Sequence, residues 1–218
     1  MPDPGPDPAL LDPPPALAES LDLVRRGQQG DRGALDELVA RYQGRVRRIV
    51  SIRMGRQFRG LLDSVDLTQE TWMAALRGLS GFEPRDHGSI IRWLARIAEN
   101  QVLDAADRVH AARRDRRREV PATETGESSV AEAAALPAAD DPSPSEVATR
   151  RELRATYDAC VAELDDVYRE VILLKDYSLL GWPEVCAQLG RPNVHATQEL
   201  YRRAQLRLGE LLRRCMAG

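Results

Sequence analysis

Residues 181–208 read GWPEVCAQLGRPNVHATQELYRRAQLRL, and this segment predicts two helices joined by a tight turn. Pro183 fits the first turn of a short helix, because a proline there removes no hydrogen bond that the helix needs. Gly190 fits the end of that helix, and a second helix begins after Pro192. A short helix, a turn with glycine and a second helix form a helix-turn-helix pattern.

The helix-turn-helix pattern closes a module that begins near Ala148. In two further segments of this module, apolar residues recur at the spacing of one helix face. The first segment carries Leu153, Tyr157, Cys160, Val161 and Leu164, and the second carries Val167, Val171, Ile172 and Leu174. We therefore expect residues 148–218 to form one small all-helical domain.

A second helical module is predicted over residues 21–119. Apolar residues follow the i, i+3, i+4, i+7 rule for four turns between Leu35 and Val50. Gly55 and Gly60 then interrupt the pattern and indicate a loop. The module therefore opens with one long helix that ends before these glycines.

Two more helices are expected in this module. Asp63 or Ser64 can cap the first of them. Its apolar positions are Leu67, Trp72, Leu76 and Leu79, with Trp72 in the core. The stretch GFEPRDHG, residues 81–88, indicates a loop, and a long helix from Ile90 can run into the arginine cluster at 113–118. Neither module shows strand-like alternation, so we predict an all-α fold of two small helical domains.

Two segments beside the first module differ from it in composition. Residues 1–20, MPDPGPDPALLDPPPALAES, are rich in proline and hold little to bury, so we expect a disordered acidic tail. Residues 120–147, VPATETGESSVAEAAALPAADDPSPSEV, lack apolar periodicity and are expected to form a flexible acidic linker.

Charge is segregated along the chain, although the net charge of −3 hides this. Residues 24–119 hold twenty arginines against thirteen acidic residues, whereas residues 1–23 hold five acidic residues and residues 120–147 hold six, both without a base. Residues 148–218 are nearly neutral, with eleven bases against ten acids. Because a guanidinium group can bind a phosphate in a bidentate way, the basic module is a candidate for binding nucleic acid.

Several classes of protein are poorly supported. No apolar run of roughly 18 residues is present, so we expect no membrane insertion. The start of the chain has neither the basic nor the apolar region of a secretory signal, and we expect a cytoplasmic protein. The cysteines (Cys160, Cys186 and Cys215) and the three histidines are scattered, which disfavours a disulfide framework and a metal site. We see no catalytic constellation, so we expect neither an enzyme nor a cofactor.

Four motifs resemble one family, the extracytoplasmic-function (ECF) group of bacterial RNA polymerase sigma factors. They are GDRGALDELVARYQGRV (30–46), DLTQETW (66–72), WLARIAENQVLDAADR (93–108) and WPEVCAQLG (182–190). They occur in the family's order, with the linker between the third and the fourth. The resemblance implies a region-two helical bundle followed by a region-four helix-turn-helix, and a transcription initiation factor that binds core RNA polymerase, selects promoters and helps to melt the minus-ten element. It also implies control by an anti-sigma factor.

The resemblance assigns roles to three sets of residues. Asp66, Gln69 and Glu70 share one helix face and correspond to the polymerase-binding set. The set for the minus-ten element of promoter DNA is Phe82, Arg85, His87, Arg92, Trp93, Arg96, Asn100, Arg108, Arg113 and Arg114. The set for the minus-thirty-five element is His195, Thr197, Gln198, Arg202 and Arg203, on the second helix of the helix-turn-helix.

The residues by themselves leave other interpretations open. Asp66, Gln69 and Glu70 also fit a solvated polar face, Trp93 also fits the core, and Asn100 also fits a contact within the domain. Gln198 stands where the family commonly has a basic residue, so we expect the last module alone to bind DNA weakly. At the level of the whole chain, the alternatives are a stand-alone helix-turn-helix regulator and a polymerase-binding protein without initiation activity.

Overall fold

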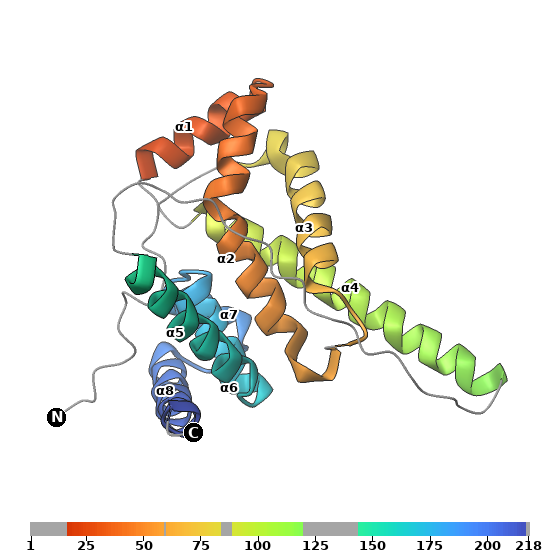
Figure 1. Cartoon of the computed structure of the whole chain (residues 1–218), viewed down its shortest axis with the longest axis vertical. Coiled ribbons are helices and arrows are strands. Elements are labelled where there is room, and N and C mark those ends of the chain that lie inside the picture. The colour runs from red at the N-terminus through yellow and green to blue at the C-terminus, as the bar shows by residue number, and fades with distance from the viewer. Residues whose placement is uncertain (1–16, 59, 84–88, 120–143, 217–218) are drawn as a thin grey trace.

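The structure, a computed structural model, describes residues 17–58, 60–83, 89–119 and 144–216 (Figure 1). All regular elements within these ranges are helices, so the all-α prediction is confirmed. Residues 1–16 and 120–143, which are most of the expected tail and linker, lie outside the described residues, as do 84–88 of the expected loop. Among the described helices, none is long and apolar enough to cross a membrane.

Four α-helices build the N-terminal module. They are α1 (Leu17–Gln28), α2 (Arg32–Phe58), α3 (Ser64–Gly78) and α4 (Ser89–Glu119), and a short 3-10 turn, η2 (Leu79–Gly81), follows α3. Asp63 caps α3 as expected, since its Oδ1 accepts a hydrogen bond of 2.7 Å from the backbone nitrogen of Val65. Trp72 is buried in the core, which confirms its predicted position.

Helix α1 is the element that the sequence analysis missed. It begins at Leu17, so the last residues of the expected tail are helical. Leu23 and Val24 are buried in the core, and the Tyr42 hydroxyl of α2 lies 3.0 Å from the Ser20 hydroxyl. The predicted boundary at residue 20 is therefore wrong, because the prolines before residue 16 concealed a helix whose apolar face packs on α2.

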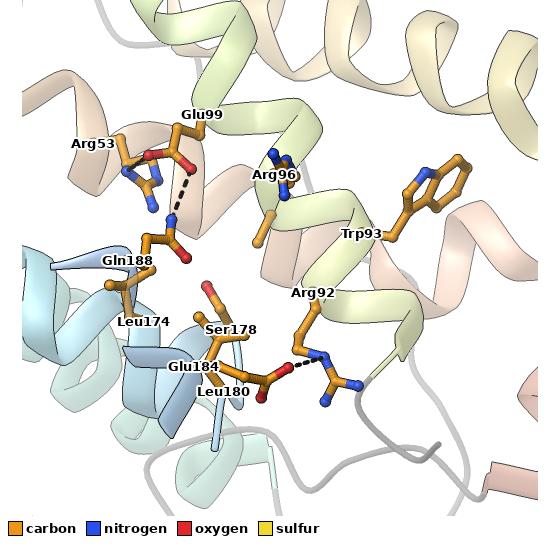
Figure 2. Close-up of a pocket in the computed structure, with 11 residues that line it drawn as sticks. Arg53, Arg92, Trp93, Arg96, Glu99, Leu174, Ser178, Leu180, Glu184 and Gln188 are labelled. Atoms are coloured by element: carbon orange, nitrogen blue, oxygen red, sulfur yellow. Dashed lines mark hydrogen bonds and ion pairs between the residues drawn. The ribbon is translucent and has the colours of Figure 1, made fainter. Parts of the chain in front are cut away.

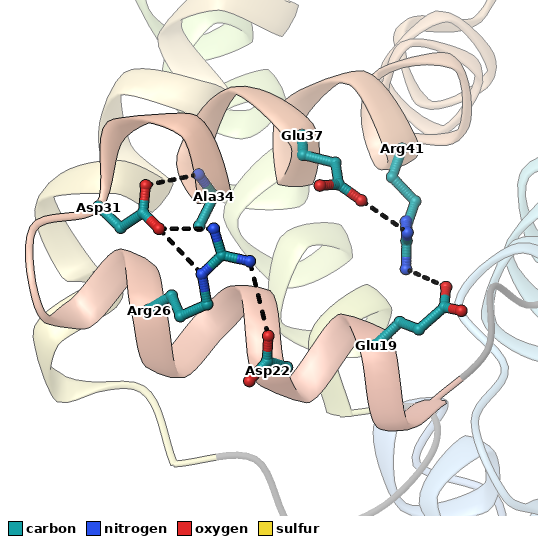
Figure 3. A network of polar contacts seen from close by, with 7 residues as sticks. All are labelled: Glu19, Asp22, Arg26, Asp31, Ala34, Glu37 and Arg41. Carbon is teal, nitrogen blue, oxygen red and sulfur yellow. Dashed lines mark hydrogen bonds and ion pairs between the residues drawn. The ribbon is translucent and has the colours of Figure 1, made fainter.

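Ion pairs also join α1 to the start of α2 (Figure 3). Arg26 lies between Asp22 and Asp31, at 3.7 and 2.6 Å, and Arg41 lies between Glu19 and Glu37, at 3.2 and 2.9 Å. Most of these side chains are well exposed, so water screens the pairs and each stabilises the fold only weakly. The apolar face of α1 therefore matters more than its charges.

Helix α2 runs further than expected and contains a break. Gly55 has φ 57° and ψ −176°, which is not a helical conformation, and Gly60 has φ 88°. Glycine adopts positive φ without the steric cost of a Cβ atom. The two glycines therefore do interrupt the helix as predicted, although one further turn, up to Phe58, lies between them.

The C-terminal module contains α5 (Pro144–Ala162), α6 (Asp166–Ile172), a π-helical turn η3 (Leu173–Tyr177), α7 (Trp182–Gln188) and α8 (Val194–Met216). Helices α7 and α8 form the predicted helix-turn-helix. Pro183 lies in the first turn of α7, Gly190 has φ 59° in the turn, and the Asn193 side chain accepts a hydrogen bond from the backbone of Ala196 in the first turn of α8.

The two modules pack against each other, with α5, α6 and η3 lying along α2 (Figure 1). Arg48 of α2 forms an ion pair of 2.7 Å with Asp158 of α5. Arg45 is buried and donates hydrogen bonds to the carbonyl oxygens of Tyr177 and Asp176, at 3.1 and 3.3 Å. We call this contact surface between the modules the seam.

Candidate nucleic-acid interface

The predicted polymerase-binding residues lie on an open face of α3. Asp66 and Gln69 are exposed, and Glu70 is partly exposed and forms an ion pair of 3.2 Å with Arg108 of α4. Three large apolar side chains on the same helix are also exposed: Val65 at 40%, Met73 at 53% and Leu76 at 41%. Together these six residues form what we call the α3 face.

The exposed apolar residues of the α3 face are its main new feature. Leu76 was counted among the apolar positions of this helix, yet it does not lie in the core. Polar residues at the rim and large apolar residues at the centre are typical of protein–protein contacts. The helical periodicity of Val65, Gln69 and Met73 could have revealed this face from sequence.

A polar stripe runs along α4. Arg92, Arg96 and Asn100 recur every four residues and so lie on one side of the helix. Arg96 and Asn100 are exposed, whereas Arg92 is partly covered and lies 3.8 Å from Glu184 of α7. Among the described residues, no hydrogen bond ties Asn100 to the interior of the domain, and its side chain is open to solvent.

The two aromatic residues of the minus-ten set lie together. The Phe82 and Trp93 rings stack, with centroids 4.5 Å apart and planes at 22°. Phe82 is buried and supports Trp93, which is partly exposed. We therefore correct the role predicted for Phe82: with only 9% of its surface exposed, it supports Trp93 from the core.

The rest of the predicted minus-ten set is only partly described. Arg108 is exposed and paired with Glu70. Arg113 and Arg114 belong to α4, but their side chains lie outside the described part of the chain. Arg85 and His87 fall within residues 84–88, which are also outside it.

A small cleft separates the stripe of α4 from the C-terminal module (Figure 2). Arg92, Arg96 and Glu99 line it from α4, while Glu184 and Gln188 line it from α7. Its volume is about 240 Å³, less than the roughly 300–1,000 Å³ of small-molecule sites. The cleft is thus a gap in the seam, where the proposed nucleic-acid face meets the second module.

Charges inside the cleft hold the modules together. Arg53 of α2 reaches Glu99 at 3.3 Å and Glu170 of α6 at 3.0 Å, and Glu99 in turn accepts a hydrogen bond of 3.2 Å from Gln188. Burial raises the pKa of the Glu170 carboxyl, and the positive charge of Arg53 opposes this rise. No local sequence pattern reveals this network, because the partners lie up to 117 residues apart.

The predicted minus-thirty-five residues lie on α8. His195, Gln198, Arg202 and Arg203 are exposed, and Arg202 forms an ion pair of 3.2 Å with Glu199. Thr197 is fully buried, and its hydroxyl donates to the carbonyl oxygen of Asn193. We therefore correct its assignment: Thr197 fixes the start of α8 and cannot contact DNA.

A buried carboxylate supports α8 from inside. Asp176 accepts hydrogen bonds from the Tyr201 hydroxyl at 2.8 Å and from Gln205 at 3.2 Å. Burial raises the pKa of Asp176 to about 6, and these two hydrogen bonds limit the rise. Among the described residues, no cluster of three or more histidine, cysteine or acidic side chains could hold a metal ion.

Comparison with known proteins identifies the family. Residues 38–118 match the family described as Sigma-70 region 2. The chain is 31% identical over 170 residues to the ECF RNA polymerase sigma factor SigE of Mycolicibacterium smegmatis, in an alignment that covers 74% of this chain and 56% of the relative. Residues 38–118 are thus a sigma-70 region 2, and the chain is similar to ECF sigma factors. Region two therefore comprises α2, α3 and nearly all of α4, and it carries both the α3 face and the stripe on α4.

Other relatives extend the similarity of this chain beyond region two. The RNA polymerase sigma-H factor of Pseudomonas aeruginosa is 27% identical over 171 residues, which are 78% of this chain and 82% of the relative. The solved structure of CnrH in complex with the cytosolic domain of CnrY has a TM-score of 0.50 at 25% identity, over 89% of this chain and 97% of CnrH. The chain spans 56%, 31% and 42% of three relatives, SigE of M. smegmatis, BldN of Streptomyces coelicolor and the sigma-E factor of Haemophilus influenzae.

Proposed function

We propose that this chain is a sigma factor of the ECF type, a transcription initiation factor that binds core RNA polymerase, directs it to specific promoters and helps to melt the minus-ten element. The observation that carries the proposal is that one region-two bundle bears two exposed surfaces, the α3 face and the polar stripe on α4. The α3 face offers Asp66, Glu70 and exposed apolar residues, while Arg96 and Asn100 stand exposed on α4. Such a bundle can dock on a large partner and hold unpaired bases at the same time.

The minus-ten contact is proposed for the stripe on α4 together with Trp93 and Arg108. The partly exposed Trp93 ring can contact a base, and Arg96 can pair with a phosphate. The minus-thirty-five contact is proposed for His195, Gln198, Arg202 and Arg203, which are exposed on α8. The minus-ten face is partly covered by α7, so we expect the free chain to bind promoter DNA weakly.

A protein partner is also proposed. The solved relative CnrH is bound to the cytosolic domain of CnrY. We propose that an anti-sigma factor binds this chain in a similar way and keeps it from polymerase.

Run-off transcription with purified core polymerase and genomic promoter fragments tests the main proposal. The variant Asp66→Arg/Glu70→Arg should lose polymerase binding and transcription, because it reverses both charges of the α3 face. A matched control, Asp22→Arg/Asp36→Arg, makes the same change in charge on exposed positions of α1 and α2 and should still transcribe. Circular dichroism should show that both variants fold.

The experiment also separates the alternatives. A stand-alone regulator would bind promoter fragments tightly without polymerase, and its transcription would not depend on the α3 face. A polymerase-binding protein without initiation activity would bind core polymerase and yield no transcript from any promoter. Normal transcription by the Asp66→Arg/Glu70→Arg variant would show that the assigned docking surface is wrong.

A further inference from the structure

Two of the three cysteines meet in the C-terminal module. Cys160 lies in α5, and Cys215 lies in the last turn of α8, yet their Sγ atoms are only 3.4 Å apart. Cys160 is 1% exposed, whereas Cys215 is exposed. The third thiol, Cys186, belongs to α7 and is engaged elsewhere, 3.4 Å from the carbonyl oxygen of Arg191.

A disulfide between the paired thiols needs little movement. The S–S bond is about 2.05 Å long, so the sulfur atoms would have to approach by roughly 1.4 Å. Cys160 is fixed in a packed helix, but Cys215 lies within the last turn of α8, where helix ends readily fray. We propose that Cys160 and Cys215 are a reversible thiol–disulfide pair, closed by a peroxide and opened by a dithiol, that fastens the end of α8 to α5.

The two thiols differ in a way that suits them to different steps. Burial raises the pKa of Cys160 to about 12, and the neighbouring Cys215 thiol adds to the rise. Cys160 is thus protonated and shielded from oxidants, while Cys215 is open to them. Cys215 should therefore react first, and Cys160 should resolve the product.

The chemistry balances with hydrogen peroxide as the oxidant. The Cys215 thiolate attacks one peroxide oxygen, the O–O bond breaks, and a sulfenic acid and water form after uptake of one proton. The Cys160 sulfur then attacks the Cys215 sulfur, the S–O bond breaks, and the leaving hydroxide takes the Cys160 proton to give a second water. In sum, two thiols and one peroxide give one disulfide and two waters. A dithiol reductant reverses the bond by thiol–disulfide exchange.

The structural effect of the bond is restricted to the C-terminal module. The bond would close a loop of 55 residues between α5 and α8, which contains the whole helix-turn-helix. Closing such a loop restricts the unfolded chain and so stabilises the folded module. The exposed residues at the start of α8 lie at the opposite end of that helix, so the bond does not cover them.

Counting free thiols in the full chain tests the proposal. The reduced protein is treated with hydrogen peroxide, catalase removes the excess, and free thiols are counted after denaturation. We expect the count to fall from three to one and to return to three with dithiothreitol. A non-reducing peptide map should show the Cys160–Cys215 link, and the midpoint of thermal unfolding should rise by up to roughly 10 °C in the oxidised form.

Two single substitutions make the test specific. Cys186→Ser is the matched control: its count should fall from two to zero, with the same rise in midpoint. Cys215→Ser removes an exposed side chain, so it should fold normally, and it should keep both thiols and show no rise. The proposal is overturned by a link that involves Cys186, by dimers linked through Cys215, by sulfinic acid at Cys215 instead of a disulfide, or by three thiols that remain free.

Discussion

Replacement of Arg53 by methionine probes an ion-pair network in the seam. The Arg53 side chain is 8% exposed and holds Glu99 and Glu170 together, at 3.3 and 3.0 Å. Methionine keeps much of the apolar stem but removes the charge, so the two carboxylates would face each other without a cation. Removing one partner of a buried ion pair costs about 3–5 kcal/mol, because the remaining charge stays desolvated.

The matched control is Arg26→Met. Arg26 lies closer to its partner, 2.6 Å from Asp31, but the two side chains are 47% and 37% exposed. Water screens such a pair, so its loss should cost little stability. Loss of the longer Arg53 contacts should therefore lower the free energy of unfolding several times more than loss of the shorter Arg26–Asp31 contact, since burial decides the strength of an ion pair.

The effect of Arg53→Met should also depend on pH. Burial already raises the pKa of Glu170 in the folded protein, and removal of Arg53 takes away the charge that opposes this rise. A carboxyl with a raised pKa favours the folded state in its protonated form, so its unfavourable contribution grows as pH rises above the unfolded value. The loss of stability should thus be largest near pH 8 and smaller near pH 5.

Urea unfolding of the wild type and both variants at pH 8 and pH 5 measures these changes. The reasoning is refuted if Arg53→Met costs no more than Arg26→Met, or if its cost is the same at both pH values. Hydrogen exchange gives an independent readout, because α6 should open more readily in Arg53→Met than in the control.

Three further predictions concern stability and use the same urea assay. The wild type should lose about 3 kcal/mol of stability between pH 4 and pH 7, because the buried Asp176 carboxyl, with its pKa raised to about 6, must lose its proton as pH rises. Asp176→Asn should abolish this loss, and an unchanged pH profile would contradict the explanation. Leu23→Ala should cost about 2–5 kcal/mol if α1 is part of the core, since Leu23 is 3% exposed, and a loss below 1 kcal/mol would show that α1 is dispensable. Gly44→Ala, within α2, should stabilise the protein by about 0.5–1 kcal/mol, whereas Gly190→Ala should destabilise it by about 1–2 kcal/mol. Neither new Cβ atom meets a neighbour, so the two sites differ in the positive φ of Gly190, and equal effects would refute this explanation.

Local signals in the sequence predicted most helices correctly. Asp63 as a cap, Pro183 in a first turn and Gly190 at a helix end each act through their own backbone neighbours, so their effects can be read without knowledge of the fold. Helix α1 escaped because its apolar face is short and follows directly after a proline-rich stretch. The composition of residues 1–20 predicts a disordered tail, and this prediction concealed that Leu17–Gln28 form one helix with Leu23 and Val24 on its buried face.

The candidate site was harder to predict, because its surroundings come from distant parts of the chain. Phe82 and Thr197 were placed on the DNA-binding surface by position in a motif, but tertiary packing buries both. The arginines of α2 were counted as charge available for phosphate. Arg48 and Arg53 instead pair with acidic residues of the second module, a contact that no local pattern of charge reveals.

The hydrogen bonds of Arg45 have a consequence for how the seam can evolve. Arg48 and Arg53 contact carboxylates, so a change on one side invites a compensating change on the other. Arg45 donates hydrogen bonds to the main-chain oxygens of residues 176 and 177, and every amino acid supplies such an oxygen. Paired substitutions among homologous sequences should thus reveal the two contacts with carboxylates and miss these two hydrogen bonds to the main chain.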